Sequence, residues 1–165
     1  MAKKQKKQTK KKTKQQNVHA VVARHNELKA AISRSGLWLI VYSATSFAML
    51  FAMPGAALYA AIPAILSLIL AFVFGGMLKK KDFDNVGSLD IVCIVTSILE
   101  GLTVLFWLVV AVFGTMGFIN AHPDAPGGVV SILLFSCLNI VVAIVTVVYL
   151  IKCTKVLRIA KNSKA

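Results

Sequence analysis

Glu100 is the residue of this 165-residue chain whose position most requires a chemical explanation. It is the only acidic or basic residue between Ile91 and Ile119, a stretch dominated by Ile, Val, Leu and Phe. An ionised carboxylate at the centre of a membrane costs about 3 kcal/mol or more, so the side chain should be protonated, paired or directed into a bundle interior. There it could hold a proton or a cation in a transport site, it could form a hydrogen bond that locks helices together, or it could contact a partner helix.

Three further polar residues fall near the depth of Glu100. At about 1.5 Å per residue, Glu100 lies on the order of 14 Å from the start of its apolar run. Ser46, Ser67 and Asn139 fall at similar depths in the other apolar runs. We therefore predict a hydrogen-bonded layer inside the bundle, with Asn139 or a Ser or Thr as the partner of Glu100. No Lys or Arg occurs at this depth, which excludes a salt bridge within the chain.

The remaining reactive side chains form no pattern typical of an enzyme or a metal site. The sequence has no G-x-S-x-G, no H-E-x-x-H and no Gly-rich phosphate loop. Cys93, Cys137 and Cys153 form no C-x-x-C motif. We therefore expect no catalytic residue, no cofactor and no bound metal. Cys153, between Lys152 and Lys155, is a candidate for S-palmitoylation, and the alternative is an unmodified small residue.

Four apolar runs must position these residues, and they lie at residues 37–53, 56–78, 91–119 and 129–151. The composition is 58% hydrophobic and 15% charged, whereas about a quarter of the residues of a soluble domain are charged. A membrane-spanning helix needs about 20 apolar residues, and these runs do not alternate as strands would. The sequence therefore predicts an all-α polytopic membrane protein, with four transmembrane helices in an up-down bundle preceded by an interfacial amphipathic helix.

Polar or helix-breaking segments separate the runs. Pro54-Gly55 indicates a tight hairpin, and residues 79–90 form a polar loop. Residues 120–128, with two prolines and the Gly127-Gly128 pair, are predicted to be a loop as well. The third run is over-long, so it should tilt or extend past the membrane near Gly114.

The distribution of charge predicts the orientation. The chain has 19 Lys and Arg against 6 Asp and Glu, a formal net charge of +13. Every basic residue lies within residues 3–34, 79–81 or 152–164. Even-numbered crossings place these segments on one face, and the positive-inside rule makes that face cytoplasmic. We expect both termini in the cytoplasm, the tail 152–165 included, and the protein in the plasma (inner) membrane.

Two segments precede the first run. Residues 1–16 lack large apolar side chains after Met1 and are predicted to be disordered, whereas residues 17–35 show the apolar spacing of an amphipathic helix lying in the headgroup layer. The first segment either fixes topology alone or also binds anionic lipid headgroups. Nucleic acid is a weaker alternative, because no aromatic residues are interleaved with the lysines. The lysines concerned are Lys3, Lys4, Lys6, Lys7, Lys10, Lys11, Lys12 and Lys14.

These patterns favour a non-enzymatic, multi-pass integral membrane protein that acts through contacts, as an accessory, scaffold or interaction subunit with a basic cytoplasmic arm. The alternative is a small transporter or channel subunit that uses Glu100 as an intramembrane proton or cation site. Small residues spaced by four, such as Ser67, Ala71 and Gly75, allow helices to approach closely. The neighbour could be the same chain, a second copy or a partner membrane subunit.

Overall fold

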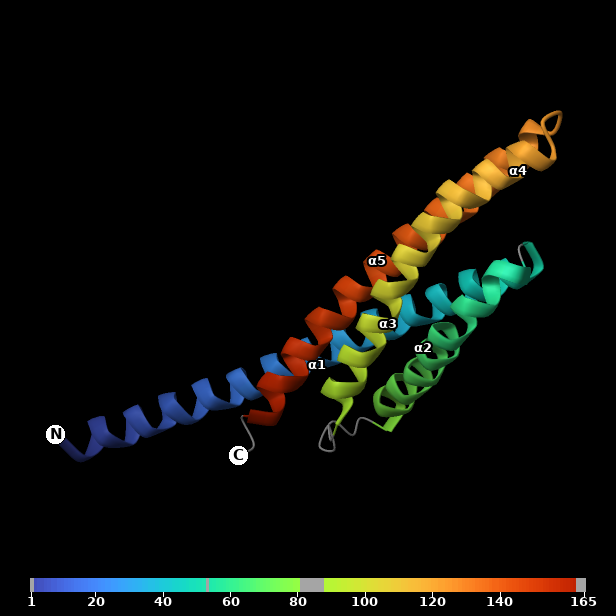
Figure 1. The fold of residues 1–165 in the computed structure, drawn as a ribbon. Coiled ribbons are helices and arrows are strands. Elements are labelled where there is room, and N and C mark those ends of the chain that lie inside the picture. Colours follow the sequence, from blue (N-terminus) through green and yellow to red (C-terminus); the bar gives the residue numbers. More distant parts are fainter. Residues whose placement is uncertain (1, 53, 81–87, 163–165) are drawn as a thin grey trace.

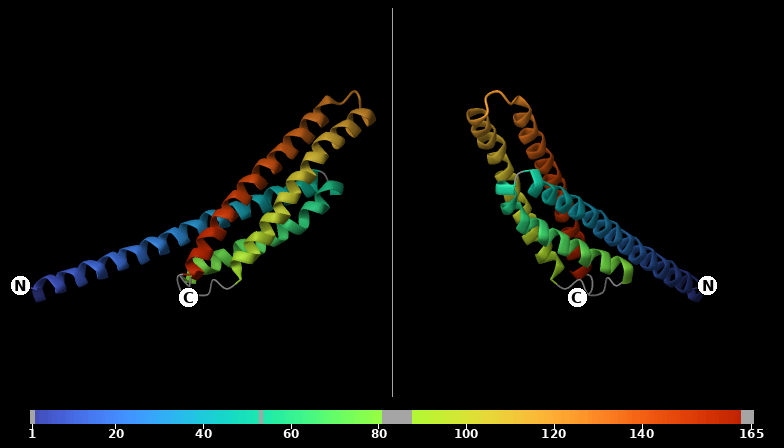
Figure 2. Two further views of the ribbon diagram at one scale, coloured as in Figure 1. Left: turned by 60° about the vertical axis from the view of Figure 1, so that its left-hand side comes forward. Right: turned by 90° about the vertical axis from the view of Figure 1, so that its right-hand side faces the viewer.

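The computed structural model describes the backbone of residues 2–52, 54–80 and 88–162, and the side chains of residues 22–49, 59, 61–79 and 88–162. In these ranges the chain is helical apart from Ser88 and the turn at residues 122–125, which confirms the all-α class. The helices form two hairpins that cross one another, α1 with α2 and α3 with α5 (Figure 1, Figure 2). The N-terminal part of α1, the end of α2, the beginning of α3 and the end of α5 lie at one end of the bundle (Figure 1).

Helix α1 (Ala2–Ala52) is continuous. It includes residues 2–16, which the sequence predicts to be disordered, and residues 17–35, which it predicts to form a separate helix. The position of residues 17–35 in a headgroup layer stays a prediction. Lys, Gln and Ala have high helix propensity, and extension of an existing helix avoids the cost of nucleation. Leu28 and Ile32 pack in the core beside Leu157 of the last helix, so this part of α1 belongs to the bundle.

Helix α2 (Pro54–Lys80) follows directly and packs along α1. Its first residue is Pro54, which suits a helix start because its missing N–H would have no partner in the first turn. The predicted run 56–78 lies within this helix. The connection 81–87, part of the predicted polar loop, lies outside the described residues.

Helix α3 (Leu89–Val109) continues through the π-helical turn η1 (Val110–Gly114) into α4 (Thr115–Ala121). This unit of 33 residues is about 50 Å long, which exceeds a hydrocarbon core of about 30 Å. Its buried residues end at Trp107, and in the described chain no residue of η1 or α4 is buried. Beyond the π turn the helix stays beside α5, and the two extend together past the ends of α1 and α2 (Figure 2).

The second turn is shorter than predicted. Helix α5 (Pro126–Asn162) begins within the predicted loop 120–128, with Gly127 and Gly128 in its first turn. A Cβ atom at Gly128 would meet the tip of the Phe118 ring of α4, so this glycine leaves room for the ring at the start of α5 and does not break the helix. The same helix extends to Asn162, so the predicted basic tail is helical up to that residue.

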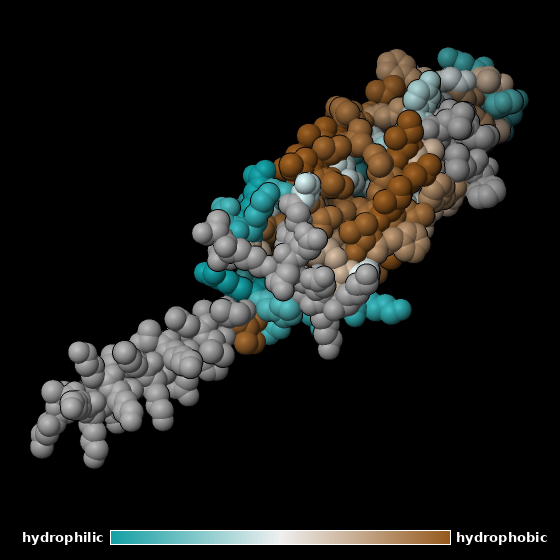
Figure 3. Space-filling model, turned by 90° about the horizontal axis from the view of Figure 1, so that it is seen from below, coloured by the Kyte–Doolittle hydropathy of each residue, from teal (hydrophilic) through white to brown (hydrophobic). Residues whose placement is uncertain are grey.

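Within the described ranges, three helical segments are long and apolar enough to cross a membrane: Ala61–Lys79, Leu89–Ala121 and Pro126–Asn162. Large apolar side chains cover the outside of these segments, with Phe72 72% exposed, Phe113 68% exposed and Leu134 64% exposed. The face in Figure 3 accordingly shows an apolar band with hydrophilic residues towards its two ends. Such an exterior is unsuited to water and matches lipid, so the chain is a helical membrane protein.

The interior has the opposite character. Buried positions recur three and four residues apart in each helix, the spacing of a left-handed helical seam. Many of them are polar, including Ser46, Ser67, Thr103, Asn139 and Thr146. Positions at this spacing are 28, 32, 35, 39, 42, 46 and 49 in α1; 93, 96, 100, 103 and 107 in α3; and 136, 139, 143, 146, 150, 153 and 157 in α5.

Candidate functional site

Glu100 lies at the centre of the seam of α3 and is fully buried, with 0% of its surface exposed. The Ser67 hydroxyl of α2 donates a hydrogen bond of 2.7 Å to Oε1 of the carboxyl group. The structure thus brings together two of the residues that the sequence places at one depth. Among the described residues, the second carboxyl oxygen, Oε2, has no hydrogen-bond partner.

Asn139 faces the same interior from α5 and is 1% exposed. Its amide Nδ2 donates to the Phe135 carbonyl oxygen at 3.0 Å, a bond within its own helix. The Asn139 Oδ1 atom has no partner among the described residues. Of the partners predicted for Glu100, Asn139 or a Ser or Thr, the structure therefore shows a Ser.

Two residues that the sequence analysis did not single out complete the layer. The Tyr42 hydroxyl of α1 lies 2.9 Å from Thr103 Oγ1 of α3. Thr103 Oγ1 donates to the Glu100 carbonyl oxygen at 2.7 Å, so Tyr42 is the donor in the first bond. Ser46 is buried on α1 one turn from Tyr42. The signal that could have found these residues is the spacing of three and four positions that relates Tyr42 to Ser46 and Glu100 to Thr103.

Side-chain hydrogen bonds connect most of the packed helix pairs. Ser43 Oγ of α1 donates to the Ala64 carbonyl of α2 at 2.9 Å. We call the end of the bundle that holds Lys79 of α2 and Arg158 of α5 the basic end. Towards this end, Ser35 Oγ of α1 donates to the Tyr149 carbonyl of α5 at 3.1 Å. Each such bond contributes about 0.6 kcal/mol on average in a membrane, so the contribution is appreciable only for the set as a whole.

The basic end of the bundle joins α3 to α5. Cys93 and Cys153 are both fully buried, and their thiols lie within hydrogen-bonding reach of one another. Cys153 shares this core cluster with Cys93 and Leu157, and the choice between S-palmitoylation and an unmodified small residue stays a prediction. Beyond them, Arg158 Nε lies 3.6 Å from Asp90 Oδ2 across the two helices.

The lysines of residues 3–14 lie on α1, and their side chains fall outside the described ones. In the described part of the chain, no three His, Cys, Asp or Glu side chains are grouped so that they could hold a metal ion.

The hydrogen-bond donors and acceptors around Glu100 determine whether its carboxyl group can be charged. Ser67 satisfies one carboxyl oxygen of Glu100, and a proton on Oε2 would make this carboxyl group a donor as well as an acceptor. Without such a proton, a buried carboxylate with no basic partner would be costly.

Comparison of the chain with protein-family models, with curated proteins and with solved structures finds no match.

Proposed function

We propose that this chain is a non-enzymatic integral membrane protein with four transmembrane helices, which acts through contacts as an accessory or scaffold subunit. The observation that carries the proposal is that polar side chains in the interior form hydrogen bonds between helices. Ser43, Ser67 and Tyr42 all form hydrogen bonds to another helix. Glu100 lies in the same interior and has no exposed surface. Such an interior suits a bundle that keeps one conformation and presents a constant outer surface to a partner.

The contact surface that we propose for a partner helix lies between α1 and α2. A groove of about 390 Å³ there is lined by Ile40, Leu68 and Phe72 together with Gly75 and Gly76. A Cβ atom at either glycine would meet no atom within 4 Å, so the surface is open to close approach by another helix. Small residues at such surfaces allow backbones to pack closely in membranes. The occupant we favour is a helix of a second copy or of a partner membrane subunit.

We also propose that both termini are cytoplasmic in a plasma or inner membrane, with the first crossing formed by residues 37–53 of α1. Trp38 and Tyr149 stack at a centroid distance of 6.0 Å, and Lys152 lies 5.7 Å from the centre of the Tyr149 ring. Aromatic residues beside lysines are typical of a membrane interface. The basic arm of α1 would then face anionic lipid headgroups, each lysine near the surface contributing about 1 kcal/mol.

A small transporter or channel subunit is the second candidate. Two unpaired atoms favour it, because Glu100 Oε2 and Asn139 Oδ1 both lack partners in the described structure. Buried oxygen atoms without donors could receive a proton or a cation. Against this reading, the membrane-spanning runs contain no second acidic residue and no basic residue to pair with Glu100.

Flux through reconstituted vesicles separates the two candidates. For an accessory subunit, the purified full chain should carry no proton, Na⁺ or K⁺ flux above empty vesicles under an imposed gradient. The Glu100→Gln variant should behave as wild type, because Gln keeps the shape and an acceptor for Ser67. Flux that depends on wild-type protein and is lost in Glu100→Gln would contradict the accessory role and establish transport. The matched control is Asn162→Gln, at the exposed end of α5.

A further inference from the structure

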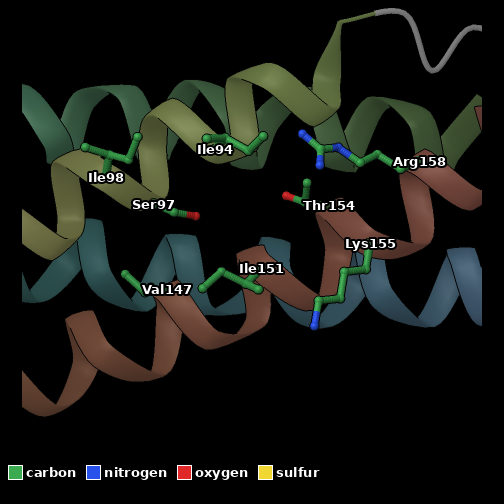
Figure 4. A pocket seen from close by; sticks show the side chains of 8 residues that line it. All are labelled: Ile94, Ser97, Ile98, Val147, Ile151, Thr154, Lys155 and Arg158. Carbon is green, nitrogen blue, oxygen red and sulfur yellow. The ribbon is translucent and has the colours of Figure 1, made fainter.

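A second groove of about 390 Å³ follows the outer surface between α3 and α5 at the basic end of the bundle (Figure 4). Its walls are mainly β-branched and apolar. Ile94 and Ile98 line it from α3, and Val147 and Ile151 line it from α5. Ile98 and Ile151 are 58% and 46% exposed, so the groove is open to the surroundings of the protein along its side.

The two hydroxyl groups in the groove do not make it polar. Ser97 Oγ donates to the Cys93 carbonyl at 2.7 Å, and Thr154 Oγ1 donates to the Leu150 carbonyl at 2.9 Å. Each hydroxyl is therefore satisfied within its own helix. The groove between them accepts a hydrocarbon chain without leaving a polar group unpaired.

One end of the groove is basic. Lys155 and Arg158 line that end from α5 (Figure 4). Asp90 pairs with Arg158 at 3.6 Å and leaves Lys155 as excess positive charge at this end. A guanidinium has five N–H donors, so pairing with one carboxylate leaves donors available to a phosphate. The Arg158 side chain is 57% exposed and can reach a headgroup.

The groove lies at one edge of the apolar runs. Its apolar walls belong to the start of the run 91–119 and to the end of the run 129–151. Lys155 and Arg158 follow Ile151 by 4 and 7 positions, about 6 and 10 Å along the helix axis. The apolar walls therefore face the part of one leaflet nearest its headgroups, and the two basic residues lie at the level of the headgroups.

We propose that this groove binds one anionic phospholipid, with an acyl chain along Ile94, Ile98, Val147 and Ile151 and the phosphate held by Lys155 and Arg158. A lipid fits better than a helix, because bulky Ile and Val walls keep another backbone at a distance. The groove between α1 and α2 differs in having two glycines. The inference rests on the proposed membrane insertion but not on which side the termini lie.

Lipid retention by the full chain tests this site. Nanodiscs containing equal amounts of phosphatidylglycerol and phosphatidylcholine present both lipids on both faces, so the result does not depend on orientation. Native mass spectrometry of the released wild-type protein should show one retained phosphatidylglycerol per chain. The variant K155Q/R158Q should lose about twenty-five-fold in preference for phosphatidylglycerol, because each of the two basic residues near an anionic headgroup contributes about fivefold.

Matched variants make the result specific. K29Q/R34Q removes one Lys and one Arg from exposed positions of α1 at the same end, and it should keep the preference. Ile151→Trp fills the groove and should abolish retention, whereas Ile144→Trp, at an exposed position two turns away on α5, should not. Thermal unfolding of each variant checks that it is folded.

Three results would overturn the proposal. The first is a wild-type preference retained in K155Q/R158Q, and the second is an equal loss in K29Q/R34Q, which would indicate general surface electrostatics. The third is occupancy elsewhere or by another molecule. Unchanged retention in Ile151→Trp would mean that the lipid binds outside the groove, and a protein dimer in place of bound lipid would mean that a second chain fills it. A failure of topology would instead appear in reporter fusions and would leave the lipid measurement unchanged.

Discussion

At the scale of the residue, Glu100 and Ser67 form the hydrogen bond that links α2 to α3 at the centre of the bundle. Removing one of these side chains costs more stability than the energy of the bond itself, because the remaining polar group stays buried without a hydrogen bond. Leaving a buried polar group unsatisfied costs about 1–3 kcal/mol, whereas removing both partners costs less.

A double-mutant cycle measures this interaction. Ser67→Ala and Glu100→Leu should each lower the free energy of unfolding in detergent, and the double variant should lose less than the sum, with a coupling energy of about 0.6–1.7 kcal/mol. Thr154→Ala is the matched control, because Thr154 is buried, its hydroxyl donates to the Leu150 carbonyl of its own helix, and it lies towards the basic end of α5 rather than beside Glu100. Its combination with Glu100→Leu should be additive to about 0.5 kcal/mol. Additivity between Ser67 and Glu100 would remove the structural role of the bond.

At the scale of the element, α3 and α5 lie together along the length of α3 and meet at Cys93 and Cys153. Their connection is the short turn after α4, so the register of the two helices follows from that turn. The register places the two thiols side by side, and it also aligns Asp90 with Arg158.

Cross-linking tests the register. A small membrane-permeant oxidant should link Cys93 to Cys153 in a disulfide within one chain, because their thiols already lie side by side, as read by mass spectrometry of the digested protein. Cys137 is exposed on α5 and should give no link within the chain, which makes the Cys137→Ala variant the control. An intramolecular link from Cys137 to Cys93 would show a different register, and so would the absence of a link in Cys137→Ala.

At the scale of the whole molecule, polarity is arranged in two directions. Across the bundle, polar residues lie inside and apolar residues outside. Along the bundle, the basic residues gather at one end, with Lys79 in the last turn of α2 and Arg158 near the end of α5. A membrane protein with this arrangement is oriented by its basic end.

Reporter fusions test the orientation. Fusions of a phosphatase or a fluorescent protein after Lys164 and within residues 81–87 should report the cytoplasm, and a fusion at Pro123 should report the outside. Replacing Lys79, Lys80 and Lys81 with Gln should weaken the bias without changing the helices. An outward signal after Lys164 or within residues 81–87 would contradict four crossings with cytoplasmic termini.

The sequence by itself determined the helical class and the apolar segments, because the length and hydrophobicity of a run are local properties. It also predicted that Glu100 and Ser67 lie at one level, since a level follows from counting residues along a helix. It placed a loop within residues 120–128 but made that loop too long, because Gly127 and Gly128 begin α5 beside the Phe118 ring of α4. Only the tertiary structure decided that Tyr42 meets Thr103, that Asn139 turns to its own helix and that Cys93 meets Cys153. These contacts depend on the rotation and register of helices distant in the sequence, which packing of the whole bundle fixes.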